Sequence, residues 1–141
     1  DGPAIVGGSA TLTKIAAPGE GIAPAAGLPS PSGCAVQPNW AHPSDRVKGA
    51  ASGDGTTNCI LPVAQLTYIP VLFRVIAGVP TPIGDRDGYS YIGNGVRIVG
   101  GSSKENPCRS GSIYVSHGSG ISIEASGTFT GQKSAPGKTV C

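Results

Sequence analysis

Few residues in this chain could perform chemistry. The tetrapeptide Asp85-Arg86-Asp87-Gly88 resembles the start of an acidic calcium loop, with carboxylates at alternate positions before a glycine. A calcium site needs about six to eight oxygen ligands, and only Asn94 lies close enough in sequence to add one. The alternative is a turn in which the aspartates bond their own backbone. We therefore expect the turn and predict no metal site; Asp85 and Asp87 are the residues of the calcium alternative.

No nucleophile and base are arranged as a catalytic site. Ser116-His117 and Gly118-Ser119-Gly120 do not form a Gly-x-Ser-x-Gly elbow, which also needs a strand-to-helix setting. The eight acidic residues are spread along the chain and provide no obvious carboxylate pair for glycoside hydrolysis. We therefore predict no catalytic residue, no enzymatic activity and no cofactor.

The cysteines point to disulfides and to secretion. None belongs to a Cys-x-x-Cys motif, and neither histidine lies at metal-ligand spacing from them, so zinc is not predicted. An even cysteine count in a chain without an initiator methionine is typical of a secreted protein. Of the three possible connectivities we favour the one in which each of the two disulfides closes a loop within one half of the chain. These pairs are Cys34–Cys59 and Cys108–Cys141.

Aromatic residues offer a further binding hypothesis. Tyr89 and Tyr91 share one face of an expected strand and could stack on sugar rings, as could Trp40, Tyr68 and Tyr114. Cross-strand packing is the alternative use of such a pattern. A host or surface glycan is thus a further expected partner.

Composition excludes other partners. The net charge is only +2 and the ten Lys and Arg residues form no basic run, which argues against nucleic acid and anionic membranes. Residues 60–79 have the length of a membrane span. They contain Pro62, Gln65, Pro70 and Arg74 and many β-branched residues, so buried strands with a kink at Pro70 are expected instead.

Alternating apolar and polar residues predict an all-β fold, an antiparallel sheet or sandwich with two disulfides. Residues 34–59 should be a loop region with little regular structure and one helical turn at 40–45. The strands should form a meander, in which Asn94-Gly95 and residues 117–120 turn two hairpins. The predicted strands are 60–69, 70–79, 89–92, 96–99, 112–116, 121–125 and 128–130.

The N-terminus is expected to form a strand that is separate from the rest of the domain. Apolar residues alternate along residues 1–15, and a segment rich in proline and glycine, residues 16–33, separates this strand from the domain at 34–141. Such a strand can add to its own sheet or to that of a neighbour. The predicted subunit-interface residues are Ala4, Val6, Gly8, Ala10 and Leu12.

Gly7-Gly8 within this strand and Cys34-Ala35-Val36 at the start of the domain resemble fimbrial pilins of the chaperone–usher type. The resemblance implies that the extension fills a groove in the next subunit. Here the linker is longer, the Cys34–Cys59 spacing is shorter, and the chain ends in Thr139-Val140-Cys141 instead of an aromatic-containing strand. The second cysteine pair is similar to the C-terminal disulfide loop of type IV pilins, whose N-terminal apolar helix is missing here.

These features predict a structural subunit of an extracellular fibre, pilus or surface assembly, a cell-surface appendage built from identical chains that associate by β-strand addition. The alternatives are a monomeric secreted binding module, such as an adhesin, lectin or inhibitor, and a small secreted hydrolase.

Overall fold

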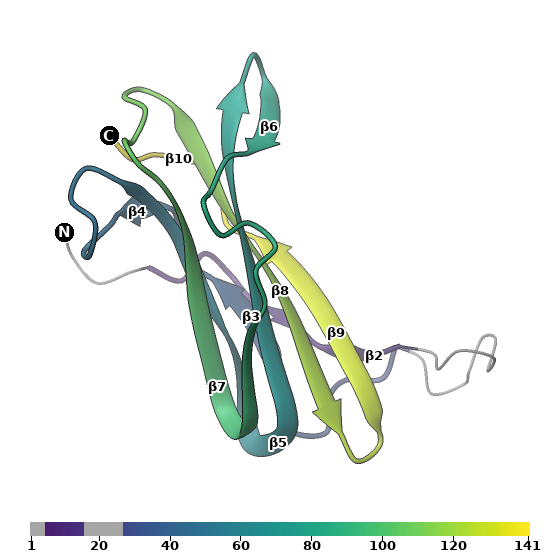
Figure 1. The fold of residues 1–141 in the computed structure, drawn as a ribbon. Helices are drawn as coiled ribbons and strands as arrows, with labels where there is room; N and C mark the ends of the chain where they lie inside the picture. The colour runs from purple at the N-terminus through teal and green to yellow at the C-terminus, as the bar shows by residue number, and fades with distance from the viewer. Residues whose placement is uncertain (1–4, 16–26) are drawn as a thin grey trace.

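The computed structural model describes residues 5–15 and 27–141, and this part of the chain is all-β (Figure 1). The predicted all-β antiparallel fold is confirmed. No helix long and apolar enough to cross a membrane occurs in these ranges. The strands are β1 (Ala10–Thr11), β2 (Thr13–Lys14), β3 (Ala35–Pro38), β4 (His42–Pro43), β5 (Ala51–Ile76), β6 (Val79–Pro82), β7 (Tyr91–Glu105), β8 (Ile113–Glu124), β9 (Gly127–Ser134) and β10 (Lys138–Thr139).

Strands β5 and β7 each bend sharply at the same end of the molecule. The two halves of each strand therefore lie in two different layers. The Thr57 hydroxyl donates to the Thr67 carbonyl at 2.7 Å, and the Tyr91 hydroxyl donates to the Ser102 carbonyl at 2.9 Å. Partners ten or eleven positions apart would be separated by roughly 35 Å in a straight strand. Figure 1 shows both strands turning at the same end of the molecule, where the β5–β7 register shifts between Asn58 and Val63.

Within the described residues, each strand pairs with neighbours in one of these two layers, and only β5 and β7 contribute to both. The first layer contains β1, β3, β4, residues 51–58 of β5 and residues 98–105 of β7. The second layer contains β2, β6, β8, β9, β10, residues 63–76 of β5 and residues 91–96 of β7. The result is a β-sandwich in which every ladder between strands is antiparallel.

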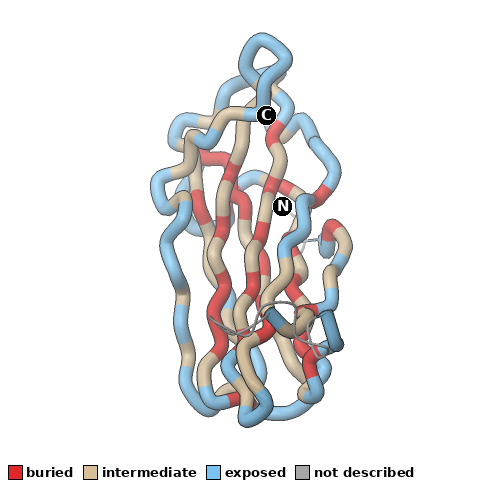
Figure 2. The backbone as a smooth tube through the Cα atoms, turned by 90° about the vertical axis from the view of Figure 1, so that its right-hand side faces the viewer, coloured by how far each residue is buried: buried red, intermediate tan, exposed pale blue. Residues whose placement is uncertain are grey.

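The core lies between the layers in two clusters, and buried positions alternate with half-buried ones along β8 and much of β5 (Figure 2). The larger cluster packs Leu12, Cys34, Val36, Val63, Leu66, Tyr68 and Phe129. The smaller cluster packs Ala41, Ala51, Leu72 and Tyr114 near the other end of the sandwich. The large cluster includes Leu12, a residue of the N-terminal segment.

Both predicted hairpins are wrong. The residues on either side of Asn94-Gly95 pair with β5 instead of with each other. Residues 117–120 lie inside β8, because their glycines leave room for side chains of the facing strands. A Cβ on Gly118 would lie 2.5 Å from the Tyr68 ring, and one on Gly120 would lie 2.8 Å from the Thr57 hydroxyl.

Three other local predictions are also wrong. Residues 34–59 contain β3, β4 and the start of β5, and the expected helical turn at 40–45 is replaced by β4, which pairs with Ala51 and Ser52. The expected break at Pro70 is absent, since β5 continues to Ile76. The Pro70 carbonyl accepts from Gly88 N–H on the side away from β8, so the missing N–H of Pro70 also faces that side and interrupts no ladder bond.

Candidate functional site

The N-terminal segment, residues 5–15, lies antiparallel to residues 28–40 and closes one side of the sandwich. Val6 bridges to Asn39, and β1 pairs with β3. Thr13 lies between the two layers, bridged to Pro29 on one side and paired with Thr130 of β9 on the other. The segment therefore forms one arm of a long hairpin and also joins the first layer to the second.

The structure divides the predicted interface residues into separate groups. Leu12 is 0% exposed and belongs to the large core cluster, and Ala10 packs against that cluster. Val6 is 53% exposed, because Gly8 takes a φ of +115° and interrupts the alternation of faces. Ala4 lies outside the described residues. Of the three alternating residues that the structure describes, Ala10 and Leu12 share the expected apolar face and Val6 does not.

The carboxylate of Glu124 forms hydrogen bonds with the stretch of chain beside this segment, at Ser30 and Ser32. The Glu124 side chain accepts from the Ser30 hydroxyl at 2.6 Å, from the Ser32 N–H at 3.0 Å and from the Ser122 hydroxyl at 2.8 Å. Burial raises the pKa of Glu124, but these hydrogen bonds outweigh burial and leave the pKa below its ordinary value. Residues 5–15 thus occupy a groove between residues 28–40 and β9. Since Ser30 N–H also donates to the Leu12 carbonyl, Glu124 holds one wall of this groove in place.

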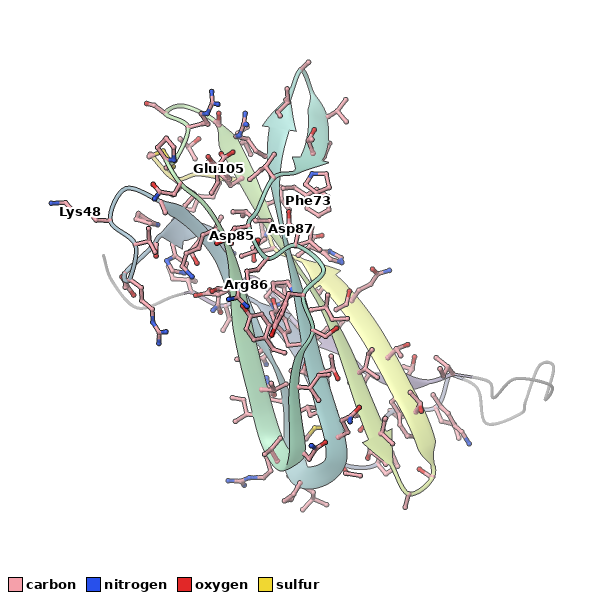
Figure 3. The ribbon with its side chains drawn as sticks, viewed as in Figure 1. Lys48, Phe73, Asp85, Arg86, Asp87 and Glu105 are labelled. Carbon is pink, nitrogen blue, oxygen red and sulfur yellow. A yellow bond between two sulfur atoms is a disulfide. The ribbon has the colours of Figure 1, made fainter. Side chains whose placement is uncertain are left out.

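The opposite side of the sandwich is closed by the loop that contains the calcium candidates (Figure 3). Asp87 accepts from the Leu72 N–H of the second layer at 2.7 Å, from the Ser103 hydroxyl of the first layer at 2.8 Å, and from the Gly84 N–H at 2.6 Å. Asp85 accepts from the Lys104 N–H at 2.8 Å. These carboxylates cap groups at the sheet edges, and only the bond from Gly84 N–H to Asp87 lies within the turn itself, as expected for the alternative to a cation site.

Both predicted disulfides are confirmed. Cys34 is bonded to Cys59, which ties the start of β3 to the bend in β5. Cys108 is bonded to Cys141, which ties the loop before β8 to the last residue. The two bonds secure opposite ends of the body and leave the N-terminal segment without a covalent link of its own to the sandwich.

A polar cleft of about 610 Å³ opens on the outer face of the first layer. Residues of β5 and β7 line it together with residues of β4, the loop after β4 and the loop at Asp85 and Arg86. The lining residues are Asn39, His42, Ser44, Asp45, Arg46, Ser52, Asp54, Gly55, Thr56, Asp85, Arg86, Tyr91, Gly100, Gly101, Ser102 and Lys104. We refer to this site as the polar cleft.

A hydrogen-bonded set of side chains organises one end of the cleft. Asp54 accepts from the Asn39 amide at 2.9 Å, and its other oxygen lies 3.0 Å from His42 Nε2. His42 Nδ1 lies 2.7 Å from the Pro43 carbonyl oxygen. Both partners of the ring are acceptors, so the arrangement favours the doubly protonated imidazolium. Neither ring nitrogen faces a nucleophile.

This pair predicts a pH dependence of stability. The hydrogen bond to Asp54 raises the pKa of His42 above 6.5, against the opposing effect of burial. Burial raises the pKa of Asp54, but the hydrogen bonds from His42 and Asn39 outweigh it and hold that pKa below 3.8. The contribution of His42 is present below pH 6.5 and is lost as pH rises through its folded-state pKa. That of Asp54 is present above pH 3.8 and is lost as pH falls through its folded-state pKa.

The free energy of unfolding should therefore fall by up to about 1 kcal/mol between pH 6 and pH 9 relative to the variant His42→Gln. Chemical denaturation at several pH values measures this difference. A difference between the two proteins that stays constant with pH would contradict the assignment.

The predicted aromatic residues are dispersed. Tyr68 and Tyr114 are buried in the core, while Trp40 lies under Lys138, whose Nζ is 5.1 Å from the ring centroid. Tyr89 and Tyr91 pack edge to face at 4.9 Å, and of the five aromatic residues Tyr91 alone lines the polar cleft. Of the residues proposed to stack on sugar rings, Tyr91 is therefore the one that lies at the polar cleft.

Sequence reasoning missed His42, Asp54 and Lys104 as members of one site. A signal was present in residues 51–57, where small residues alternate with Ser52, Asp54 and Thr56. This period of two places three polar side chains on one face of a strand. Comparisons with protein-family models, with curated proteins and with solved structures find no match to this chain, so its functional interpretation rests on the geometry.

Proposed function

We propose that the chain is a structural subunit of an extracellular fibre, and that subunits join by exchanging the N-terminal strand. The observation that carries the proposal is the position of Leu12, a fully buried core residue supplied by a terminal hairpin arm. A neighbouring chain has the same groove and offers the same contacts. Opening the hairpin between residues 15 and 27 would replace contacts within a chain by identical contacts between chains, which is domain swapping.

The sequence between the two described ranges supports exchange. Residues 16–26 contain Pro18 and Pro24 and no β-branched residue other than Ile22, a composition that favours extended polyproline-like chain. Extended at roughly 3 Å per residue, this stretch would span more than 30 Å. When each strand enters the next chain instead of being exchanged reciprocally, the contact is head to tail, and such a contact that does not close on itself propagates into a filament. Two disulfides in the body are consistent with an extracellular setting.

Negative-stain microscopy and light scattering of the full chain test this function. Filaments should form, and an excess of a peptide of residues 1–15 should shorten them by filling the groove. The matched control peptide carries Leu12→Asp and should have no effect, because a charge cannot enter the core site. A monodisperse monomer at high concentration, or filaments indifferent to the peptide, would contradict the proposal.

A second candidate is the monomeric secreted binding module, which the polar cleft favours. The two functions separate in one experiment, since a binding module remains monomeric in light scattering.

A further inference from the structure

The polar cleft concentrates charge in a chain that has little of it. Three of the ten Lys and Arg residues and three of the eight Asp and Glu residues line this one depression, together with one of the two histidines. The cations are Arg46, Arg86 and Lys104, and the carboxylates are Asp45, Asp54 and Asp85. Surface charge placed for solubility alone would be spread over the molecule.

The carboxylates in the cleft form more hydrogen bonds with the rest of the protein than the cations do. Asp54 and Asp85 already accept hydrogen bonds from protein donors. Lys104 Nζ donates only to the Ser102 hydroxyl, and within residues 5–15 and 27–141 neither Arg46 nor Arg86 forms an ion pair. The Arg86 guanidinium lies 4.7 Å from the centroid of the Tyr89 ring, which leaves its N–H groups free to donate, and Asp45 is the one lining carboxylate that accepts no hydrogen bond from the described residues. The N–H donors of the three cations still outnumber this one acceptor, so the ligand they suit supplies acceptor oxygens and a negative charge.

The shape suits a small hydroxylated molecule. The volume lies within the range of small-molecule sites. Gly100 keeps the floor low, because a Cβ there would lie 3.0 Å from the Gly55 carbonyl oxygen. Tyr91 is fixed at the wall by its hydrogen bond to Ser102. The hydroxyl and amide groups of Asn39, Ser52 and Thr56 also line the site.

The lining argues against other classes of ligand. It contains no aliphatic side chain, whereas a peptide would be expected to anchor an apolar residue. Equal numbers of cations and carboxylates oppose a polyanion such as nucleic acid. A molecule with many hydroxyls and one carboxylate matches both the donors and the mixed charge.

We propose that the polar cleft binds a sugar acid, most simply a uronate residue of a saccharide, with its carboxylate at Lys104 and Arg86 and its hydroxyls toward Asn39 and Thr56. This function goes beyond strand exchange and does not depend on it, since the cleft lies on the outer face of the first layer. The cleft's partner is thus a carbohydrate surface or polymer that carries carboxylates.

The full chain is tested on an array of immobilised mono- to tetrasaccharides in three classes: uronate-bearing, sulfated without carboxylate, and neutral. Binding should be confined to the uronate class. For a saccharide that binds, Lys104→Gln and Arg86→Gln should each weaken binding by about tenfold or more. Lys48→Gln is the matched control, because Lys48 is exposed, carries the same charge and does not line the cleft (Figure 3).

Thermal unfolding of each variant establishes that the fold is kept, and filament formation by Lys104→Gln should be unchanged. The proposal is overturned if no saccharide binds, if neutral or sulfated saccharides bind as well as uronates, or if Lys48→Gln weakens binding as much as Lys104→Gln. Loss of filaments without loss of saccharide binding would contradict strand exchange alone.

Discussion

Replacing Leu12 by alanine is expected to lower the free energy of unfolding by about 2–5 kcal/mol. Leu12 is fully buried and packs in the large core cluster with Val36 and Phe129, so truncation leaves a cavity between the two layers. The matched control is Val6→Ala in the same segment, which should change stability little because Val6 is 53% exposed.

Chemical denaturation of the two variants measures the difference. The result should hold whether the strand fills its own groove or that of a neighbour, since the contacts are the same. Equal and small effects of the two substitutions would mean that the N-terminal segment does not enter the core, and the basis for strand exchange would be lost.

Replacing Asp87 by alanine should destabilise the chain by about 2–3 kcal/mol. The Asp87 carboxylate accepts hydrogen bonds from Leu72, Gly84 and Ser103, and the first and last of these belong to different layers. Its removal leaves the Leu72 N–H at a sheet edge without its acceptor. The midpoint of urea unfolding is the measurement.

Asp85→Ala and Asp45→Ala provide a graded control for Asp87→Ala. Asp85 accepts one protein hydrogen bond from Lys104 N–H and is exposed, so a smaller loss of stability is expected. Asp45 is exposed and should matter least. If calcium addition raised the unfolding midpoint of the wild type and Asp87→Ala abolished that rise, the loop would be a cation site instead of an edge cap.

Strand character and disulfide pairing could be predicted from the sequence because both depend on local pattern. The alternation of Ile113, Val115, Ile121 and Ile123 with polar residues predicts strands. The sequence pattern does not reveal that these residues belong to a single strand, β8. Pairing Cys34 with Cys59 and Cys108 with Cys141 closes loops within each half of the chain.

The long strands could not be predicted, because tertiary contacts override local signals for turns. Gly118 and Gly120 look like turn residues, yet they are needed where β8 passes close to Tyr68 and Thr57. Pro70 looks like a break, yet its ring lies where no ladder N–H is required. The polar cleft depends on the register that pairs Ser52, Asp54 and Thr56 of β5 with residues of β7 far away in the sequence, and local patterns do not encode that register.

The most direct test of strand exchange uses two chains that each carry one new cysteine. Thr13 and Thr130 are register partners in antiparallel strands, a separation of about 5.5 Å between Cα atoms that suits a disulfide. Chains with Thr13→Cys are co-expressed with chains carrying Thr130→Cys, and the assembled protein is run on a non-reducing denaturing gel. Lys48→Cys in place of Thr13→Cys is the control. Strand exchange predicts a disulfide-linked pair of one chain of each kind, absent in the control. Only single chains in both samples would show that the strand stays in its own sandwich.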